Sequence, residues 1–141
     1  MARTRTTANA PTTRAAVRGP FDEDCPSRVV LNHVANRWGT LILTCLHSQP
    51  MRFHALRDTI GGISEKMLSQ NLRLLIRDGL VQRDVEPTTP PKVTYSLTPL
   101  GKELADHVQA LVDWITARTD AIVAAQRRYD AQNTTNPTPD A

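Results

Sequence analysis

One amphipathic stretch constrains the fold of this chain more than any other segment. Residues 63–80 read ISEKMLSQNLRLLIRDGL, and a helix with about 3.6 residues per turn gives this stretch two distinct sides. The apolar side consists of Leu68, Leu72, Leu75 and Ile76. The opposite side contains no acidic residue and consists of Lys66, Ser69, Gln70, Arg73 and Arg77. Exposed helical faces usually mix both signs of charge, so this face indicates an anionic partner.

Length and composition set the broad class of protein. The 141 residues suffice for one domain with a hydrophobic core. The net charge of +3 and the pI of about 9.2 also favour an anionic partner. We expect no membrane span, because no apolar run is long enough, and no secretory signal, because the N-terminus lacks an apolar core. These features predict a cytoplasmic protein.

Both ends of the chain differ in composition from its centre. Residues 1–20 contain four Arg, no acid and almost no large apolar side chain, which predicts a disordered basic arm. Residues 130–141 are polar and predict a disordered tail. Residues 21–129 then form one domain, which ends in a helix over about 98–129.

Three helices are predicted before the amphipathic stretch. Pro26 suits the first turn of a helix that carries Val29, Val30, Leu31 and Val34. Residues 37–47 are apolar all round, which predicts a buried helix. Residues 53–60 predict a short helix whose inward side consists of Phe53, Leu56 and Ile60.

The segments around and after the amphipathic helix carry clear boundary residues. A tight turn at 61–62 precedes it, Ser64 is a good N-cap, and Gly79 ends it. The apolar period then changes to two over residues 81–97, which predicts a β-hairpin with the long tip EPTTPPK. Thr98 caps the long last helix. The predicted fold is mainly α with a small β-hairpin wing, a winged helix-turn-helix.

This architecture suggests how the basic face is used. The residues from Ser64 to Arg77 would meet double-stranded DNA, with Ser69 and Gln70 at base edges. The cations Lys66, Arg73 and Arg77 would neutralise phosphates or read guanine, and Lys92 in the wing would add a further contact. The alternative interpretation is a solvated basic face without a partner.

The sequence also resembles the HxlR-type winged helix-turn-helix regulators of bacteria. The resemblance rests on CP at 25–26, RWGTLILTCL at 37–46, MRFHALRDTIGGISEKMLSQNLRLLIRDGLVQR at 51–83 and PPKVTYSLTPLG at 90–101. It implies a homodimer whose interface is built by the N-terminal segment and the last helix. It also implies regulation of transcription, in some members repression of detoxification genes, and in several members oxidant sensing through the cysteine that Cys25 matches.

The last helix carries an apolar stripe of its own. Its members recur at spacings of three, four or seven and include Leu104, Val108, Leu111 and Ile115. A stripe this long exceeds what one small domain can cover, so we expect these residues to form the dimer interface. Two-fold symmetry would then require a palindromic operator.

The cysteines and histidines are the candidate sites of chemistry in this sequence. Cys25 lies at a helix start, where the dipole favours a thiolate, but the neighbouring acidic residues 22–24 oppose this effect. A structural role for Cys25 therefore remains open, and Cys45 is expected to fill the core. The four histidines match no metal-ligand spacing, and no catalytic or nucleotide-binding motif is present. We expect no metal, no cofactor and no enzymatic activity.

These observations converge on a dimeric, sequence-specific transcriptional regulator. Repression is favoured, with Cys25 as the candidate switch that responds to an oxidant or an electrophile. Two alternatives stay open: a regulator that responds to a small organic effector while Cys25 is idle, and a winged-helix module whose basic face binds an acidic protein surface.

Overall fold

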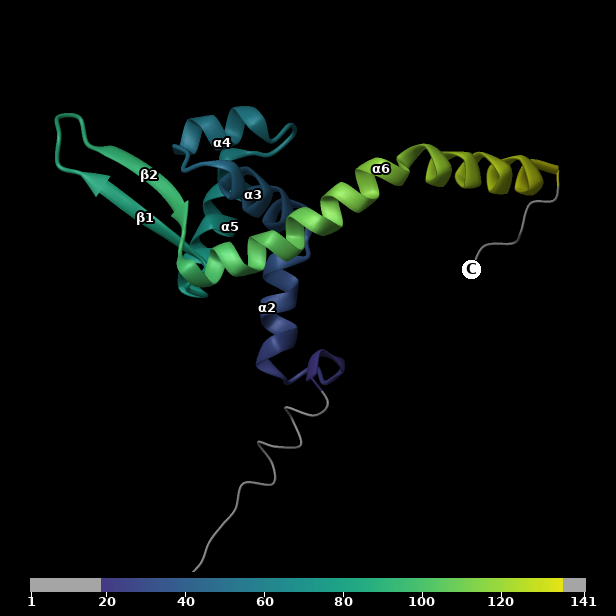
Figure 1. Ribbon diagram of the computed structural model, residues 1–141, viewed down its shortest axis with the longest axis horizontal. Helices are drawn as coiled ribbons and strands as arrows, with labels where there is room; N and C mark the ends of the chain where they lie inside the picture. The colour runs from purple at the N-terminus through teal and green to yellow at the C-terminus, as the bar shows by residue number, and fades with distance from the viewer. Residues whose placement is uncertain (1–18, 136–141) are drawn as a thin grey trace, which may run out of the picture.

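The computed structural model describes residues 19–135. Its elements are η1 (Gly19–Phe21), α2 (Pro26–Val34), α3 (Arg37–Ser48), α4 (Phe53–Thr59), α5 (Glu65–Arg77), β1 (Val81–Glu86), β2 (Lys92–Leu97) and α6 (Pro99–Thr135), as Figure 1 shows. This order confirms the predicted fold class: α4, the turn and α5 are the helix-turn-helix, and the hairpin is the wing. None of the helices between Gly19 and Thr135 combines the length and apolar character needed to span a membrane.

Both predicted domain boundaries need correction. Gly19 and Pro20 belong to the 3-10 turn η1, so the part of the predicted arm that can be compared is ordered, and residues 1–18 lie outside the described part. The helix α6 runs to Thr135, so the prediction of disorder from residue 130 was wrong for 130–135. The chain contains no helix-breaking residue there until Pro137, and an established helix extends by one hydrogen bond per added residue. Residues 136–141 are not described.

The core lies where α3, α5, the base of the hairpin and the first turns of α6 meet. Its largest fully buried side chains are Ile42, Leu43, Leu56, Leu68, Leu72, Leu75 and Val81. The helix α3 is less buried than its composition predicted, since Leu41 is 37% exposed and Cys45 is half-buried. This helix contacts α5, α6 and β2, and also α2 and α4, while Leu41 stays outside the core.

The hairpin pairs in antiparallel register from Val81↔Leu97 to Glu86↔Lys92. Val81 is buried, whereas Val85 is 49% exposed, so the wing leaves the helical body after its first residues. A further antiparallel bridge joins Met51 to Tyr95 on the outer edge of β2. A bridge of one residue has no alternating pattern, which is why the sequence did not predict it.

The ends of α5 agree with the predicted caps. The Ser64 hydroxyl oxygen accepts a hydrogen bond from the Met67 N–H at 3.1 Å. Gly79 has φ +76°, and the Leu80 N–H donates to the Leu75 carbonyl at 3.0 Å. This is the Schellman arrangement, in which a residue in the left-handed region ends the helix and glycine fits without strain.

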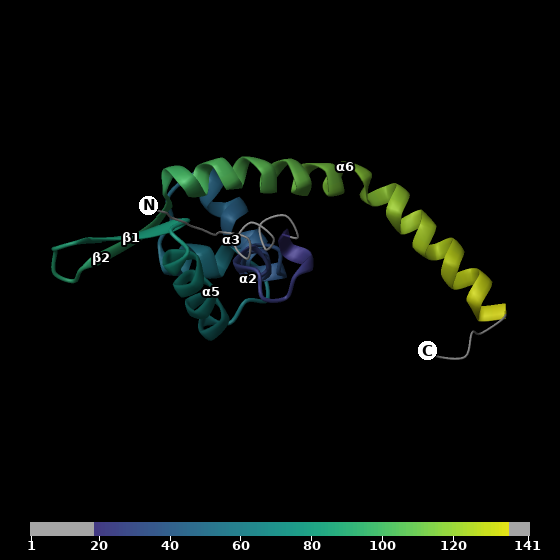
Figure 2. The same cartoon turned by 90° about the horizontal axis from the view of Figure 1, so that it is seen from below.

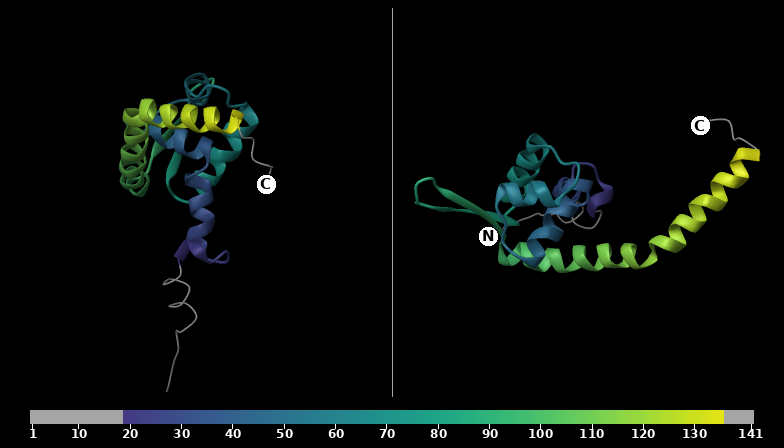
Figure 3. Two further views of the ribbon diagram at one scale, coloured as in Figure 1. Left: turned by 90° about the vertical axis from the view of Figure 1, so that its right-hand side faces the viewer. Right: turned by 90° about the horizontal axis from the view of Figure 1, so that it is seen from above.

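The arrangement of the helices separates two surfaces. Figures 2 and 3 show α6 along one side of the domain and α5 on the opposite side. The distal part of α6 bends and projects past the other elements. The exposed face of α5 is therefore free of α6.

Candidate nucleic-acid interface

The polar face of α5 is presented to solvent much as predicted. Lys66, Gln70, Arg73 and Arg77 are exposed, and Ser69 is half-buried. Ser64 is also exposed, but its oxygen already serves as the N-cap. The face therefore offers three cations and one exposed amide along one side of a 13-residue helix.

Asn71 is a polar residue of α5 that lies inside the domain. It is 7% exposed, and its side-chain N–H donates to the Met67 carbonyl at 2.8 Å. This bond within the helix satisfies the amide. The helical period did not mark Asn71 as buried because its own side chain is polar.

An ion pair across the turn removes the acid closest to this face. Arg57 of α4 donates from Nη1 to Glu65 Oε2 at 2.7 Å, and it also lies 3.4 Å from Asp58. Hydrogen bonding to Glu65, the largest effect, raises the pKa of the Arg57 guanidinium above its ordinary value. Glu65 is in the first turn of α5. Because Arg57 pairs with it, the negative charge of Glu65 is partly neutralised without using the cations on the polar face of α5.

A second tie connects α5 to the N-terminal helix. His33 Nδ1 lies 2.6 Å from Asp78 Oδ2, and the two side chains are 13% and 10% exposed. Asp78 is the C-cap residue of α5, and His33 is in the last turn of α2. The residues are 45 positions apart, so no local pattern could have predicted this contact.

The wing adds exposed cations, and its tip is shorter than the predicted EPTTPPK. Lys92 is the first residue of β2, opposite Glu86, so residues 87–91 form the tip beyond it. Arg83 on β1 is exposed as well. The alternation over residues 81–97 predicted the strand that contains Arg83 but gave this residue no role in binding.

The predicted dimer residues divide into two groups. Leu111 and Ile115 are 55% and 45% exposed, as an unpaired interface requires. Val108 is 7% exposed and belongs to the core of its own chain, and Leu104 packs half-buried against that core. Assigning Val108 to a partner was wrong, because periodicity shows that a residue is buried but not by which surface.

Apolar side chains of α2 are exposed as well. Val29, Val30 and Leu31 are 47%, 38% and 48% exposed. A hollow of about 450 Å³ lies between the two helices and is lined by Pro20, Ser27, Val30, Leu31, Val34 and Leu104. Contiguous apolar patches of this kind mark interaction sites.

The two cysteines differ in their surroundings. Cys25 is the N-cap residue of α2 and is 6% exposed, with Sγ 3.1 Å from Ser27 Oγ. Its backbone N–H donates to the Asp22 carbonyl at 3.0 Å, in a turn that directly follows η1. Cys45 is half-buried and packs against the core, in line with the expectation that it fills the core, and burial raises the pKa of its thiol.

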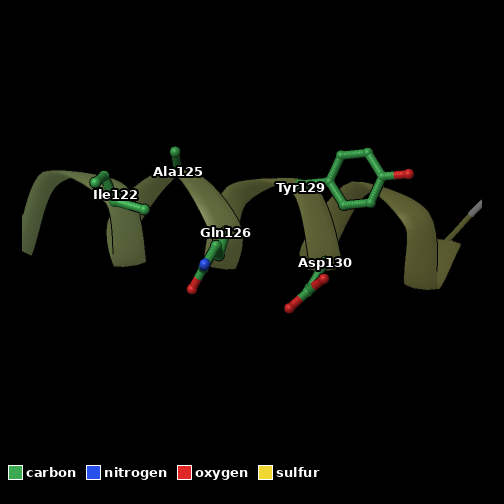
Figure 4. A pocket seen from close by; sticks show the side chains of 5 residues that line it. All are labelled: Ile122, Ala125, Gln126, Tyr129 and Asp130. Atoms are coloured by element: carbon green, nitrogen blue, oxygen red, sulfur yellow. The ribbon is translucent and has the colours of Figure 1, made fainter. Parts of the chain in front are cut away.

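Other sites for small ligands are weak among the described residues. No group of His, Cys, Asp and Glu between residues 19 and 135 could hold a metal ion. A hollow of about 520 Å³ follows distal α6, where Figure 4 shows Ile122, Ala125, Gln126, Tyr129 and Asp130 on a single helix. Side chains from one helix cannot converge around a ligand as pocket walls do.

Comparison with known proteins agrees with this architecture. The HxlR-like helix-turn-helix family matches residues 33–122. YtfH, an uncharacterized HTH-type transcriptional regulator of Escherichia coli (strain K12), is 50% identical over 106 residues, which cover 75% of this chain and 84% of YtfH. The structure of ytfH from Salmonella typhimurium has a TM-score of 0.72 at 50% identity, over 76% of this chain and 96% of that one.

A third similar protein is the redox regulator HypR in its reduced form. Its structure has a TM-score of 0.64 at 30% identity and covers 70% of this chain and 98% of HypR. The family match spans the helix-turn-helix, the wing and the first part of α6. This chain belongs to the HxlR-like helix-turn-helix family of DNA-binding transcriptional regulators.

Proposed function

We propose that this protein is a repressor that binds a palindromic operator in double-stranded DNA as a homodimer. The observation that carries the proposal is the exposed, acid-free face of α5. The major groove is about 12 Å wide and admits one α-helix between two rows of phosphates. Cations along a helix are stabilised there, and hydrogen-bonding side chains reach base edges.

The residues of α5 have separate roles in this proposal. The Gln70 amide is exposed and can donate and accept at once, which suits the N6 and N7 atoms of adenine. Lys66, Arg73 and Arg77 bind phosphates or guanine, and half-buried Ser69 adds a shorter contact. The Ser64 cap holds the first turn of α5 in place.

The homodimer is supported by the exposed apolar residues of α2 and α6. Leu111, Trp114 and Ile115 are 55%, 52% and 45% exposed, and apolar side chains of α2 are exposed as well. Two-fold pairing of such a surface would bury it against itself. It would also set two α5 helices about one DNA turn apart, which matches a palindrome.

We infer further that the signal enters at Cys25. HypR has been solved in a reduced and an oxidized form, and Cys25 of this chain is buried where η1 meets α2. An electrophile that bonds to the Cys25 sulfur, with loss of the thiol proton to water, adds bulk at this buried position. The turn at Asp22 must then open and α2 must shift, and α2 is tied to the C-cap of α5.

A small organic effector is the second candidate signal. It is favoured by the apolar hollow between α2 and α6, which is large enough for such a molecule. Operator affinity measured with and without a quinone separates the two signals. Loss in the wild type that Cys25→Ser abolishes supports Cys25 as the sensor, whereas loss that persists when both Cys25→Ser and Cys45→Ser are present supports the hollow.

DNA binding itself is tested by anisotropy with two labelled duplexes. One duplex is selected from a random pool by the full chain, and the other is a scrambled duplex of equal length. Gln70→Ala should weaken binding to the selected duplex by about 1–3 kcal/mol and leave binding to the scrambled duplex nearly unchanged. Equal weakening of both duplexes would remove Gln70 from base readout.

A further inference from the structure

A second group of basic side chains lies away from α5, in a hollow between α4 and the wing. The hollow has a volume of about 360 Å³, and its basic lining residues are Arg52, His54, Arg83 and Lys92. All of them are exposed, and no acidic residue lines the hollow. Figure 1 shows α4 and β2 next to each other, and these elements are in contact.

The backbone explains why these side chains meet. Met51 and Tyr95 exchange two hydrogen bonds, with N···O distances of 3.0 and 2.8 Å, so the segment before α4 is held along β2. Arg52 follows directly as the N-cap residue of α4. Arg83 is opposite Tyr95 in the hairpin register, so both side chains lie on the same side of the wing. Arg52 and Arg83 therefore reach one hollow from different elements.

Three apolar side chains also line the hollow and anchor its walls to the hydrophobic core. Phe53 and Val93 are half-buried, Tyr95 is 9% exposed, and all three line the hollow. Phe53 and Val93 pack against the hydrophobic core that includes Tyr95. The basic side chains are thus mounted on rigid elements rather than on a free loop.

Three of these side chains, Arg52, Arg83 and Lys92, are cations, and none of them has a counterion within the described part of the chain. Arg52, His54, Arg83 and Lys92 form no ion pair there, although Glu86 is the register partner of Lys92. Arg57, on the same helix α4, is by contrast paired with Glu65 and Asp58. Like charges gathered without counterions repel each other, so this arrangement gains free energy when an anion enters.

We propose that this hollow binds one backbone phosphate of the DNA whose major groove α5 enters. This inference rests on the proposed function and adds a contact site that is separate from base readout. In a helix-turn-helix the first helix, here α4, crosses the DNA backbone. The ridge of phosphates beside the major groove then passes between α4 and the wing. Guanidinium groups match phosphate oxygens with paired N–H donors, so Arg52 and Arg83 carry the contact.

The test uses anisotropy of the full chain on the selected and scrambled duplexes over a range of KCl concentrations. Arg52→Ala and Arg83→Ala should each weaken both duplexes by a similar factor, on the order of fivefold to tenfold at physiological salt. Each should also reduce the slope of log affinity against log salt by about 0.9, because one phosphate contact is lost. Arg127→Ala, which removes the same charge from exposed distal α6, is the matched control and should change neither quantity.

A second measurement locates the phosphate. Selected duplexes that each carry one neutral methylphosphonate should identify a position per half-site at which the wild type loses affinity. The affinity of Arg83→Ala should fall little further when the methylphosphonate is at that position. The neutral linkage and the variant remove the same contact, so their effects do not add.

Several outcomes would overturn the inference. In one of them, Arg52→Ala and Arg83→Ala keep the wild-type DNA affinity and salt slope while Gln70→Ala loses affinity for the selected duplex. In that case the phosphate site is wrong and the proposed function stands. If the variants weaken only the selected duplex, the hollow reads sequence instead. If they keep DNA affinity but lose thermal stabilisation by inorganic phosphate, the hollow holds a free anion. A wild type that does not prefer the selected duplex would end both proposals.

Discussion

His33 of α2 and Asp78 at the end of α5 join the N-terminal helix to the recognition helix. The imidazole Nδ1 lies 2.6 Å from the carboxylate Oδ2, and neither side chain is more than 13% exposed. Because Asp78 is the C-cap residue, its backbone N–H also donates to the Leu74 carbonyl at 2.9 Å. A displacement of α2 would therefore act on the C-terminal end of α5, the helix that we propose binds DNA.

Removing His33 should destabilise the domain. His33→Ala leaves the buried Asp78 carboxylate without this donor, so we expect a loss of about 1–3 kcal/mol in the free energy of unfolding. Urea unfolding followed by circular dichroism measures it. The matched control is His47→Ala, since His47 lies 2.8 Å from Asp106 in a pair that is 33% and 76% exposed. That pair should contribute about 0–1 kcal/mol. Equal losses in both variants would show that burial of the His33 pair has no energetic weight.

Gly101 should not tolerate a side chain. A Cβ at this position would collide with the Leu80 carbonyl oxygen, where the first turn of α6 passes the segment between α5 and β1. Gly101→Ala must displace backbone, so we expect at least about 1–3 kcal/mol of destabilisation. Gly61→Ala is the control, because nothing lies within 4 Å of its added Cβ. A Gly101→Ala protein with wild-type stability in thermal unfolding would refute the close approach.

Charged residues on the exposed stripe of α6 should abolish the homodimer. The double variant Leu111→Glu with Ile115→Glu leaves the core of each chain intact, since these side chains are 55% and 45% exposed. It places carboxylates in a paired apolar surface, where unpaired charge is unfavourable. Sedimentation velocity at micromolar concentration should show a monomer for the variant and a dimer for the wild type. Ala117→Glu, on another side of α6, should remain dimeric, and a monomeric wild type would end the idea.

The Cys45 thiol should react slowly, and the stability that depends on its protonation should be lost at high pH. Burial raises its pKa above the ordinary 9.0, so less thiolate forms at neutral pH and iodoacetamide labels Cys45 more slowly than a peptide thiol. The folded state favours the neutral thiol. Its contribution to stability is therefore present below the unfolded pKa and is lost as the pH rises above 9.0. Urea unfolding of wild type and Cys45→Ala on both sides of this pH checks the sign, and an identical pH dependence would contradict it.

Local chemistry made much of this fold predictable. The two sides of α5, the Ser64 cap and the Gly79 stop each depend on residues within a few positions of one another. The hairpin likewise follows from alternation over residues 81–97. Such features are set by backbone geometry that a sequence displays directly.

The remaining features depend on contacts between distant parts of the chain. His33 and Asp78 are 45 positions apart, and the Met51–Tyr95 bridge pairs β2 with a single residue that belongs to no strand. The burial of Val108 within its own domain could not be told from burial against a partner. The basic hollow was missed for the same reason, because Arg52 and Arg83 meet only once the bridge holds α4 beside β2.

The most direct test of the account is a base-pair scan of the selected duplex. Every base pair is replaced in turn, and anisotropy gives the affinity of wild type and Gln70→Ala for each duplex. We predict that Gln70→Ala loses discrimination at one base pair in each of two symmetric half-sites, about 10 base pairs apart. This prediction would be contradicted if Gln70→Ala kept the wild-type profile at every position, or if the wild type showed no symmetric pair of sensitive positions.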